Sequence, residues 1–268
     1  MKNIVLIALC ALITNLGHSQ VRDTRQDAKQ QKREEKQQRI KSLIMQEEEG
    51  AIIFQKQTVF GAKLYTDGYG VFVEMGRMKT ARKSNLYSLE LGERKHPKEE
   101  KISSGAGLYL ANPYIYGKVN NFYYAKLGFA QQRLIGNKGN KNGVAVSAIY
   151  GGGLSAGLLK PYYLKVSDPQ TNAVKDIKYN NDTLSFLNYP VIGASGFTKG
   201  FGEIKVKPGA YVKTALRFDY GRYNELVSAV EVGLNLEVYT QKIQQLLLTK
   251  DKQLFFNAYA AIEFGRRK

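Results

Sequence analysis

Long segments of this sequence alternate between apolar and polar residues, and this period of two constrains the fold more than any other feature. A strand with such a period has one apolar and one polar face. Ten or more residues per segment exceeds the usual five or six of a soluble strand and matches the roughly 9 to 11 residues of a tilted membrane-spanning strand. The pattern therefore favours a membrane barrel over a soluble sandwich. The four segments with the clearest alternation are 122–135, 207–220, 229–240 and 253–265.

In such a barrel the apolar side chains face lipid and the polar ones fill the lumen. An isolated buried charge costs several kcal/mol, so the lumen charges must pair. We expect Lys213 and Arg217 to bond Glu231 and Glu237 on the next strand. Glu74 and Glu90 of weaker strands also face inward. The predicted ionic network comprises Lys126, Lys213, Arg217, Asp219, Glu231, Glu237 and Glu263.

The N-terminus has the pattern of an export signal. Lys2 precedes an apolar run from Ile4 to Ile13, and Gly17 and Ser19 are the small residues of a cleavage site. The run is shorter than the roughly 18 residues of a membrane anchor. We predict a signal peptide over 1–19.

Residues 20–50 form a charged segment in which acids nearly cancel bases. Gln, Lys, Arg and Glu favour helix, so a short polar helix and a partly disordered arm are both compatible with this composition. The charge balance disfavours nucleic acid as a partner. We place this segment in the periplasm and the barrel over 51–268.

Turn signals set the strand count. If the chain folds back at Gly151-Gly152-Gly153, ten strands result; if these glycines only kink one strand, the count falls to eight, and a strand hidden in 167–204 would raise it. The fold class is therefore all-β, a transmembrane antiparallel up-and-down barrel of about ten strands, between eight and twelve, preceded by a short polar helix. An even count puts both termini in the periplasm. We expect short periplasmic turns near 80–84, 118–120, 151–157 and 221–224, a short outer hairpin at 66–68, and longer outer connections at 94–104, 136–142, 167–204 and 241–253.

The composition removes most catalytic chemistry. One Cys excludes a disulfide or a thiolate cluster, and two His leave little imidazole for a metal or a base. We therefore predict no metal site, no cofactor and no catalytic residue. His96 lies in a charged loop, and it would support an enzyme only beside a hydroxyl and an acid.

A net charge of +17 requires anionic neighbours. Lipid A phosphates are the nearest candidates in an outer membrane, and general interfacial anchoring by long basic side chains is the alternative. The basic residues near strand ends are Arg77, Lys79, Arg82, Lys83, Arg266, Arg267 and Lys268.

The connection 167–204 is too apolar in its second half for a freely solvated loop. It should pack into the barrel mouth or dock onto a protein partner. The residues expected to do so are Phe186, Leu187, Tyr189, Val191, Ile192 and Phe197.

Taken together, the export signal, the long alternating strands, the Tyr-rich strand ends and the final strand resemble small outer-membrane β-barrel proteins of Bacteroidota. Proteins of this class end on an assembly signal of alternating aromatic or apolar residues. The chain departs from it because four residues, 265–268, follow the last Phe. The residues similar to the signal are Asn257, Tyr259, Ile262 and Phe264.

This resemblance implies an integral outer-membrane protein with periplasmic termini. It also implies a noncatalytic accessory or scaffold subunit of an envelope assembly or secretion machine, with protein partners at 167–204 and 20–50. A pore for small solutes or lipid is the first alternative, and a lipid A-modifying enzyme is the second.

Overall fold

The structure is a computed structural model that describes residues 30–38, 54–103, 112–139, 143–168, 170–179, 189–221 and 225–268. The chain divides into two compact units, Met1–Ile53 and Phe54–Lys268. In the first unit, 30–38 form a helix whose side chains are all exposed, as a polar helix requires. Within the described part of the chain, no helix has the length and apolarity needed to cross a membrane. The predicted signal peptide 1–19 lies outside the described residues.

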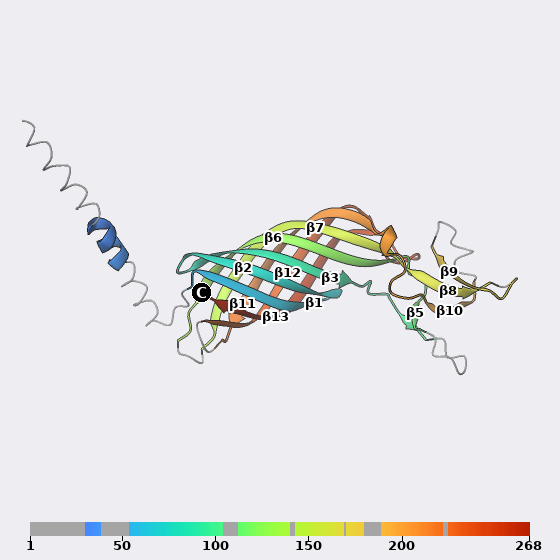
Figure 1. Ribbon diagram of the computed structural model, residues 1–268, viewed down its shortest axis with the longest axis horizontal. Helices are drawn as coiled ribbons and strands as arrows, with labels where there is room; N and C mark the ends of the chain where they lie inside the picture. The colour runs from blue at the N-terminus through green and yellow to red at the C-terminus, as the bar shows by residue number, and fades with distance from the viewer. Residues whose placement is uncertain are drawn as a thin grey trace, which may run out of the picture. The chain divides into compact units, whose positions relative to one another are not determined.

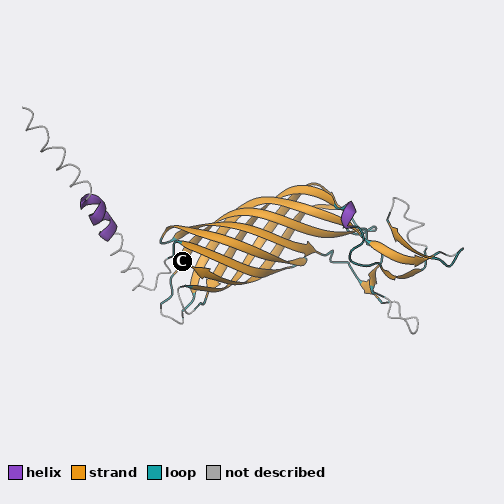
Figure 2. Ribbon diagram, in the orientation of Figure 1, coloured by secondary structure: helices purple, strands orange, loops and turns teal. Residues whose placement is uncertain are grey.

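Eight antiparallel strands of the second unit close into a barrel (Figures 1 and 2). Their order around the barrel is β1-β13-β12-β11-β7-β6-β3-β2, so the last strand pairs with the first. Phe60 of β1 lies opposite Phe264 of β13 at this closure. The strands are β1 (Lys56–Tyr65), β2 (Gly68–Thr80), β3 (Lys83–Arg94), β6 (Asn120–Gly136), β7 (Ala145–Pro161), β11 (Lys205–Asp219), β12 (Leu226–Ile243) and β13 (Lys252–Arg267).

The two faces of the barrel wall differ in polarity. On the outside, Leu154 is 71% exposed and Phe256 is 66% exposed. On the inside, Glu231, Glu237 and Glu263 are 0% exposed. An apolar exterior around a polar interior is the arrangement of a membrane barrel, because lipid replaces water outside. The predicted fold class is confirmed, with eight strands in the barrel.

The fold-back at Gly151-Gly152-Gly153 is wrong, because these residues lie inside the continuous strand β7. Gly152 pairs with Phe129 of β6 on one side and with Val212 of β11 on the other. A Cβ added to Gly153 would lie 2.0 Å from the carbonyl oxygen of Leu127. Glycine therefore permits a close approach of neighbouring strands here, which explains the cluster without a turn.

Three short connections and the C-terminus share one end of the barrel (Figure 1). They join β2 to β3, β6 to β7, and β11 to β12. The connection 136–142 was predicted at the opposite end. Four barrel strands precede it where five were predicted, and this difference of one crossing reverses its side. The turn predicted at 118–120 is also wrong, since Lys118 and Val119 end the long connection between β3 and β6, and Asn120 begins β6.

The other end carries the two longest connections, β3 to β6 and β7 to β11, which fold into ordered structure that we call the extension. The short β1–β2 hairpin and the β12–β13 connection lie at the same end. It contains a three-stranded sheet in the order β10-β8-β9 and a two-stranded pair, β4-β5. Leu164 and Val166 form its small core, at 1% and 0% exposure. All five strands have only two to five residues, too few for a clear alternation. A strand hidden in 167–204 was left open, and β9 and β10 lie there, outside the barrel sheet. The elements are β4 (Lys101–Ile102), β5 (Tyr114–Ile115), β8 (Tyr163–Ser167), β9 (Val174–Lys178), β10 (Val191–Ala194) and the 3₁₀ helix η1 (Phe201–Glu203).

Backbone hydrogen bonds join the long connections to one another. Val119 donates to the carbonyl of Gln245 at 2.8 Å, and Tyr162 donates to the carbonyl of Val119 at 2.9 Å. Ala194 donates to the carbonyl of Asn112 at 3.2 Å. Segments far apart in sequence are thereby held together at the barrel mouth.

Candidate functional site

Arg217 is the centre of one cluster of charges inside the barrel. Its Nη2 lies 2.8 Å from Glu74 Oε1 of β2 and 2.9 Å from Glu231 Oε2 of β12. Its Nε lies 2.7 Å from Glu263 Oε2 of β13. One guanidinium, 1% exposed, therefore links carboxylates from three other strands.

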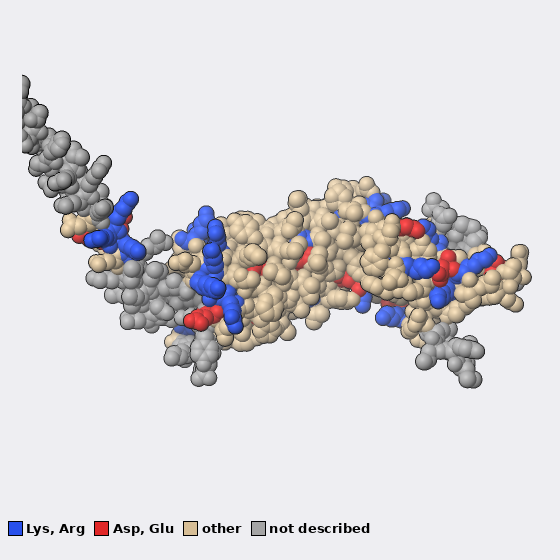
Figure 3. Space-filling model, viewed as in Figure 1, with Lys and Arg blue, Asp and Glu red and all other residues tan. Residues whose placement is uncertain are grey.

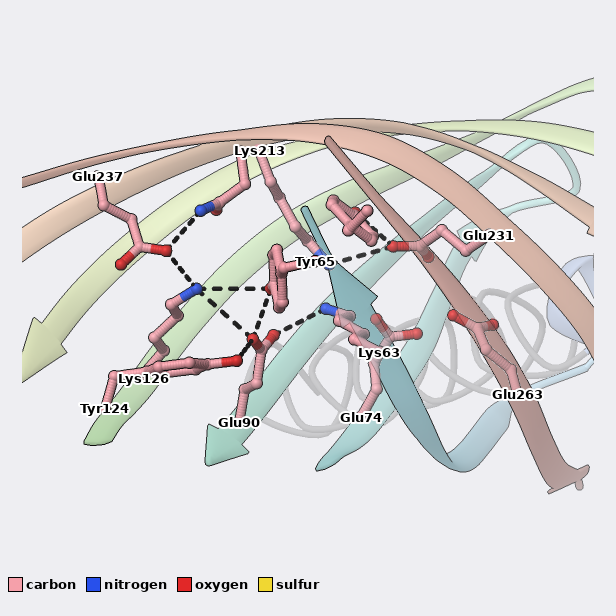
Figure 4. A network of polar contacts seen from close by, with 12 residues as sticks. Lys63, Tyr65, Glu74, Glu90, Tyr124, Lys126, Lys213, Glu231, Glu237 and Glu263 are labelled. Carbon is pink, nitrogen blue, oxygen red and sulfur yellow. Dashed lines mark hydrogen bonds and ion pairs between the residues drawn. The ribbon is translucent and has the colours of Figure 1, made fainter. Parts of the chain in front are cut away.

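A second cluster surrounds Glu90 of β3 (Figure 4). Lys63 donates to Glu90 Oε2 at 2.8 Å. The hydroxyls of Tyr65 and Tyr124 donate to Glu90 Oε1 at 2.5 and 3.1 Å. Tyrosine hydroxyls thus complete the hydrogen bonding of a carboxylate that has left water.

The third cluster is built on Glu237 of β12. Lys126 Nζ lies 2.5 Å from Glu237 Oε1 (Figure 4). Arg94 also bonds this carboxylate. Both cations come from strands that do not neighbour β12. We expected Glu237 to pair with Lys213 or Arg217 on β11; it pairs across the lumen instead, because the barrel brings non-neighbouring strands within side-chain reach.

Two further members of the predicted network lie at different levels. Lys213 is near Glu231, at 3.8 Å, on the neighbouring strand. Asp219 lies toward the C-terminal end of the barrel, where it bonds Arg267 and accepts from Lys138 at 3.3 Å. Asp219 therefore lies at the end of the lumen that carries the C-terminus and is not part of the central clusters.

Positive and negative side chains are balanced in the middle of the lumen. Every member is at most 7% exposed, so side chains and not bulk water occupy this level. The five cations are Lys63, Arg94, Lys126, Lys213 and Arg217, and the five carboxylates are Glu74, Glu90, Glu231, Glu237 and Glu263.

Sequence analysis missed two of these cations, Lys63 and Arg94. The sequence does indicate that Lys63 faces the lumen, because it alternates with the apolar Phe60, Ala62 and Leu64 and so points to the opposite face of the strand. Arg94 is the last residue of β3 and is followed by a charged loop, so its sequence context is that of a surface residue.

The four residues compared with an assembly signal divide between the two faces of β13. Asn257 and Tyr259 are buried in the lumen, and Tyr259 donates to Glu231 at 2.6 Å. Ile262 and Phe264 are 54% and 47% exposed on the lipid face. The alternating apolar series on the outside is Leu254, Phe256, Ala258, Ala260, Ile262 and Phe264.

The residues expected to dock onto a partner also divide. Tyr189 and Val191 pack against the core of the extension, whereas Ile192 and Phe197 are 38% and 68% exposed. The last two expected residues, Phe186 and Leu187, lie outside the described residues.

The basic residues considered for lipid phosphates lie at the end of the barrel that carries the C-terminus. They flank the turn between β2 and β3 or end β13. Figure 3 shows Lys and Arg gathered at this end and again on the extension. Arg267 is 6% exposed and bonds Asp219, so it is occupied inside the barrel.

His96 shares a cavity with Ser195, yet no hydrogen bond joins these two among the described residues. The backbone N–H of Lys98 donates to His96 Nδ1 at 3.2 Å, and Ser195 donates to Asp176 at 2.7 Å. Burial and nearby Lys252 lower the pKa of His96. The arrangement lacks the base-to-hydroxyl contact of a hydrolase.

In the described ranges, no group of three or more His, Cys, Asp or Glu side chains is arranged to hold a metal ion.

No protein-family model matches the sequence, and no curated protein matches it. Among solved structures, the chain is similar to the N-terminal β-barrel domain of Pseudomonas aeruginosa OprF, at 10% identity and a TM-score of 0.35, over 79% of this chain and 98% of that one. It is similar to Neisserial surface protein A at 7% identity and a TM-score of 0.39, over 80% and 95%. It is also similar to Ail, the attachment invasion locus protein of Yersinia pestis, at 8% identity and a TM-score of 0.37, over 81% and 100%. These values are low, so the barrel assignment stands on the strand pairing itself.

Proposed function

We propose that this chain is a noncatalytic outer-membrane barrel that serves as an accessory or scaffold subunit of an envelope assembly or secretion machine. The observation that carries the proposal is a contrast within one unit. The lumen is filled by paired charges, while the extension has its own ordered core and exposed apolar residues. The barrel then acts as an anchor, and the extension presents the surface that partners contact.

The proposed orientation puts both termini in the periplasm. Outer-membrane barrels have short periplasmic turns and longer outer loops, and here the two longest connections, β3 to β6 and β7 to β11, lie at the end opposite the C-terminus. In this orientation the extension faces the cell exterior. The basic residues of the β2–β3 turn, including Arg82 and Lys83, then meet phosphates of the periplasmic leaflet and not lipid A.

Ile192 and Phe197 are the best-placed contacts for a protein partner. Both are exposed apolar residues of the extension, Ile192 in β10 and Phe197 in the segment that follows it. Phe197 packs edge to face against Phe201 at 5.3 Å between ring centroids. Aromatic side chains that are held in place in this way are common among the residues that contribute most to binding in protein interfaces.

Site-specific photo-crosslinking in the native membrane tests this role. A photoreactive amino acid replaces Ile192 or Phe197, and Leu154 on the lipid face of β7 provides the matched control position. We expect protein adducts from 192 and 197, none from 154, and migration as a complex after mild detergent extraction. A monomer without adducts at any position would overturn the scaffold role.

A further inference from the structure

A cavity of about 660 Å³ lies at the barrel mouth, between the ends of the strands and the extension. This volume falls in the range of small-molecule sites, roughly 300–1,000 Å³. Tyr69, Tyr123 and Lys160 line it from the barrel, and Tyr163 and Lys199 line it from the extension. We call it the mouth pocket. It is separate from the lumen clusters and from Ile192, but its lining includes Phe197, the other residue proposed to contact a partner.

Positive charge exceeds negative charge in the mouth pocket. Five lysines line it against two glutamates, and both glutamates are engaged: Glu99 lies 2.8 Å from Lys118, and Glu93 accepts from the Tyr69 hydroxyl. Lys199 pairs with an aspartate outside the pocket. Among the described residues, no carboxylate lies within 4 Å of the remaining three lysines, Lys95, Lys101 and Lys160.

Lys160 is the only buried lysine of these last three, at 3% exposed, whereas Lys95 and Lys101 are exposed. Its ammonium lies 4.2 Å from the ring centroids of both Phe197 and Phe201 and donates to the Phe197 carbonyl. An ammonium has three N–H donors, so this carbonyl leaves two of them available. Glu93 attracts this ammonium without forming a direct ion pair with it. Burying a cation that lacks a direct ion pair is costly, and an anion bound in the pocket would reduce that cost.

Aromatic rings make up much of the remaining lining. Tyr69, Tyr123, Tyr162 and Tyr163 all belong to the lining. The hydroxyls of Tyr69 and Tyr163 already donate to glutamates, and the ammonium of Lys95 lies 5.1 Å from the Tyr69 ring centroid. Such rings provide apolar contact and hydrogen bonding from one side chain. This combination suits a sugar ring, which has an apolar face and a rim of hydroxyls. Lysines placed beside the rings suit a phosphate group on that sugar, since an ammonium binds phosphate as a point charge.

We propose that the mouth pocket binds a phosphorylated sugar, with Lys160 and Lys101 on the phosphate and the tyrosines against the ring. The same chemistry occurs in a membrane-anchored glycolipid headgroup and in a soluble sugar phosphate. Its position at the end of the strands makes the pocket accessible from the membrane surface and from solution.

Calorimetry on the full chain in detergent micelles tests the soluble source, with glucose 1-phosphate, glucose and inorganic phosphate as probes. Native mass spectrometry of the chain with purified lipid A and with its dephosphorylated form tests the lipid source. We expect binding of glucose 1-phosphate or of phosphorylated lipid A, at least about tenfold tighter than the phosphate-free counterpart, because a charge-assisted hydrogen bond is lost without the phosphate.

Lys160→Met and Lys101→Met each should weaken that binding by about tenfold or more. Lys101 is exposed, so its variant keeps the test valid if Lys160→Met does not fold. Lys165→Met is the matched control, since Lys165 is an exposed lysine of β8 outside the pocket, and the ligand affinity of this variant should equal that of the parent.

Binding only of lipid A assigns the membrane source, and binding only of glucose 1-phosphate assigns the soluble one. Failure of both probes to bind, or binding unchanged by either pocket variant, would overturn the proposal.

Discussion

The barrel and the extension use the same residue types in opposite ways. In the barrel, charges are buried and apolar side chains are exposed: Arg217 is 1% exposed, whereas Leu154 is 71% exposed. In the extension the usual order returns, with Leu164 and Val166 buried and Lys175 largely exposed. The difference teaches that exposure has two meanings in this chain, contact with lipid in one region and contact with water in the other.

Removing the cation that joins three strands should have the largest effect. Arg217→Met leaves Glu74, Glu231 and Glu263 buried without their shared partner, and breaking a buried pair costs about 3–5 kcal/mol. The free energy of unfolding is measured by titration with urea. Electrophoresis of unheated samples separates the folded and unfolded forms as two bands. The control Lys175→Met, in the extension, should leave the barrel transition unchanged. A barrel as stable as the parent would show that the lumen charges do not hold it together.

Because exposed residues contact lipid in the barrel and water in the extension, the same substitution to Lys should destabilise the two regions to different extents. Leu154→Lys places a charge in the middle of a lipid-facing strand and should cost about 2–4 kcal/mol. Val174→Lys, at a residue 63% exposed on β9, should be nearly neutral. Refolding yield and urea stability in lipid vesicles compare them. Equal costs at both positions would contradict the lipid-facing assignment.

Paired lumen charges should also be coupled in energy. Lys63→Met and Glu90→Gln each remove one side of the same 2.8 Å ion pair, so the double variant should lose less than the sum of the two. The expected coupling is about 1–3 kcal/mol. A double-mutant cycle in urea measures it, and the exposed pair Lys175 and Asp168 should give a much smaller value. Additive single effects at Lys63 and Glu90 would speak against a working ion pair.

The smallest effect should be local and confined to the extension. Hydrogen bonds from Lys175 and the Gln170 backbone lower the pKa of Asp168 from 3.8 to about 2. This carboxylate therefore stabilises the turn between β8 and β9 above pH 3.8, and the contribution disappears as the pH falls through about 2. Hydrogen exchange of this turn between pH 5 and pH 2 follows the change. Asp168→Asn should remove this pH dependence. If the variant and the parent chain show the same pH dependence, the assignment to Asp168 is wrong.

The alternation of side chains made the barrel predictable, because lipid enforces one face over every long strand. Strand count was not fixed in the same way. Gly151-Gly152-Gly153 has the composition of a turn, and only the close approach of β6 and β11 explains why it is straight. The extension was less accessible still, since its strands are short and its core residues come from connections far apart in sequence.

Membership of the lumen network was more predictable than its pairing. The alternation of polar and apolar residues alone assigns Arg217 and Glu231 to the interior, and they lie opposite each other on neighbouring strands. The partners of Glu237 come from β3 and β6 across the lumen. Such contacts depend on closure of the whole barrel, which no local pattern encodes.

The central claim is that paired charges close the lumen and leave the extension to carry the function. Single-channel recording of the purified chain in a planar bilayer tests it most directly, with insertion verified by the gel shift of the folded form. The account predicts a flat current for the parent chain at all applied voltages. Regular conductance steps from the folded parent would contradict it and would make the chain a pore.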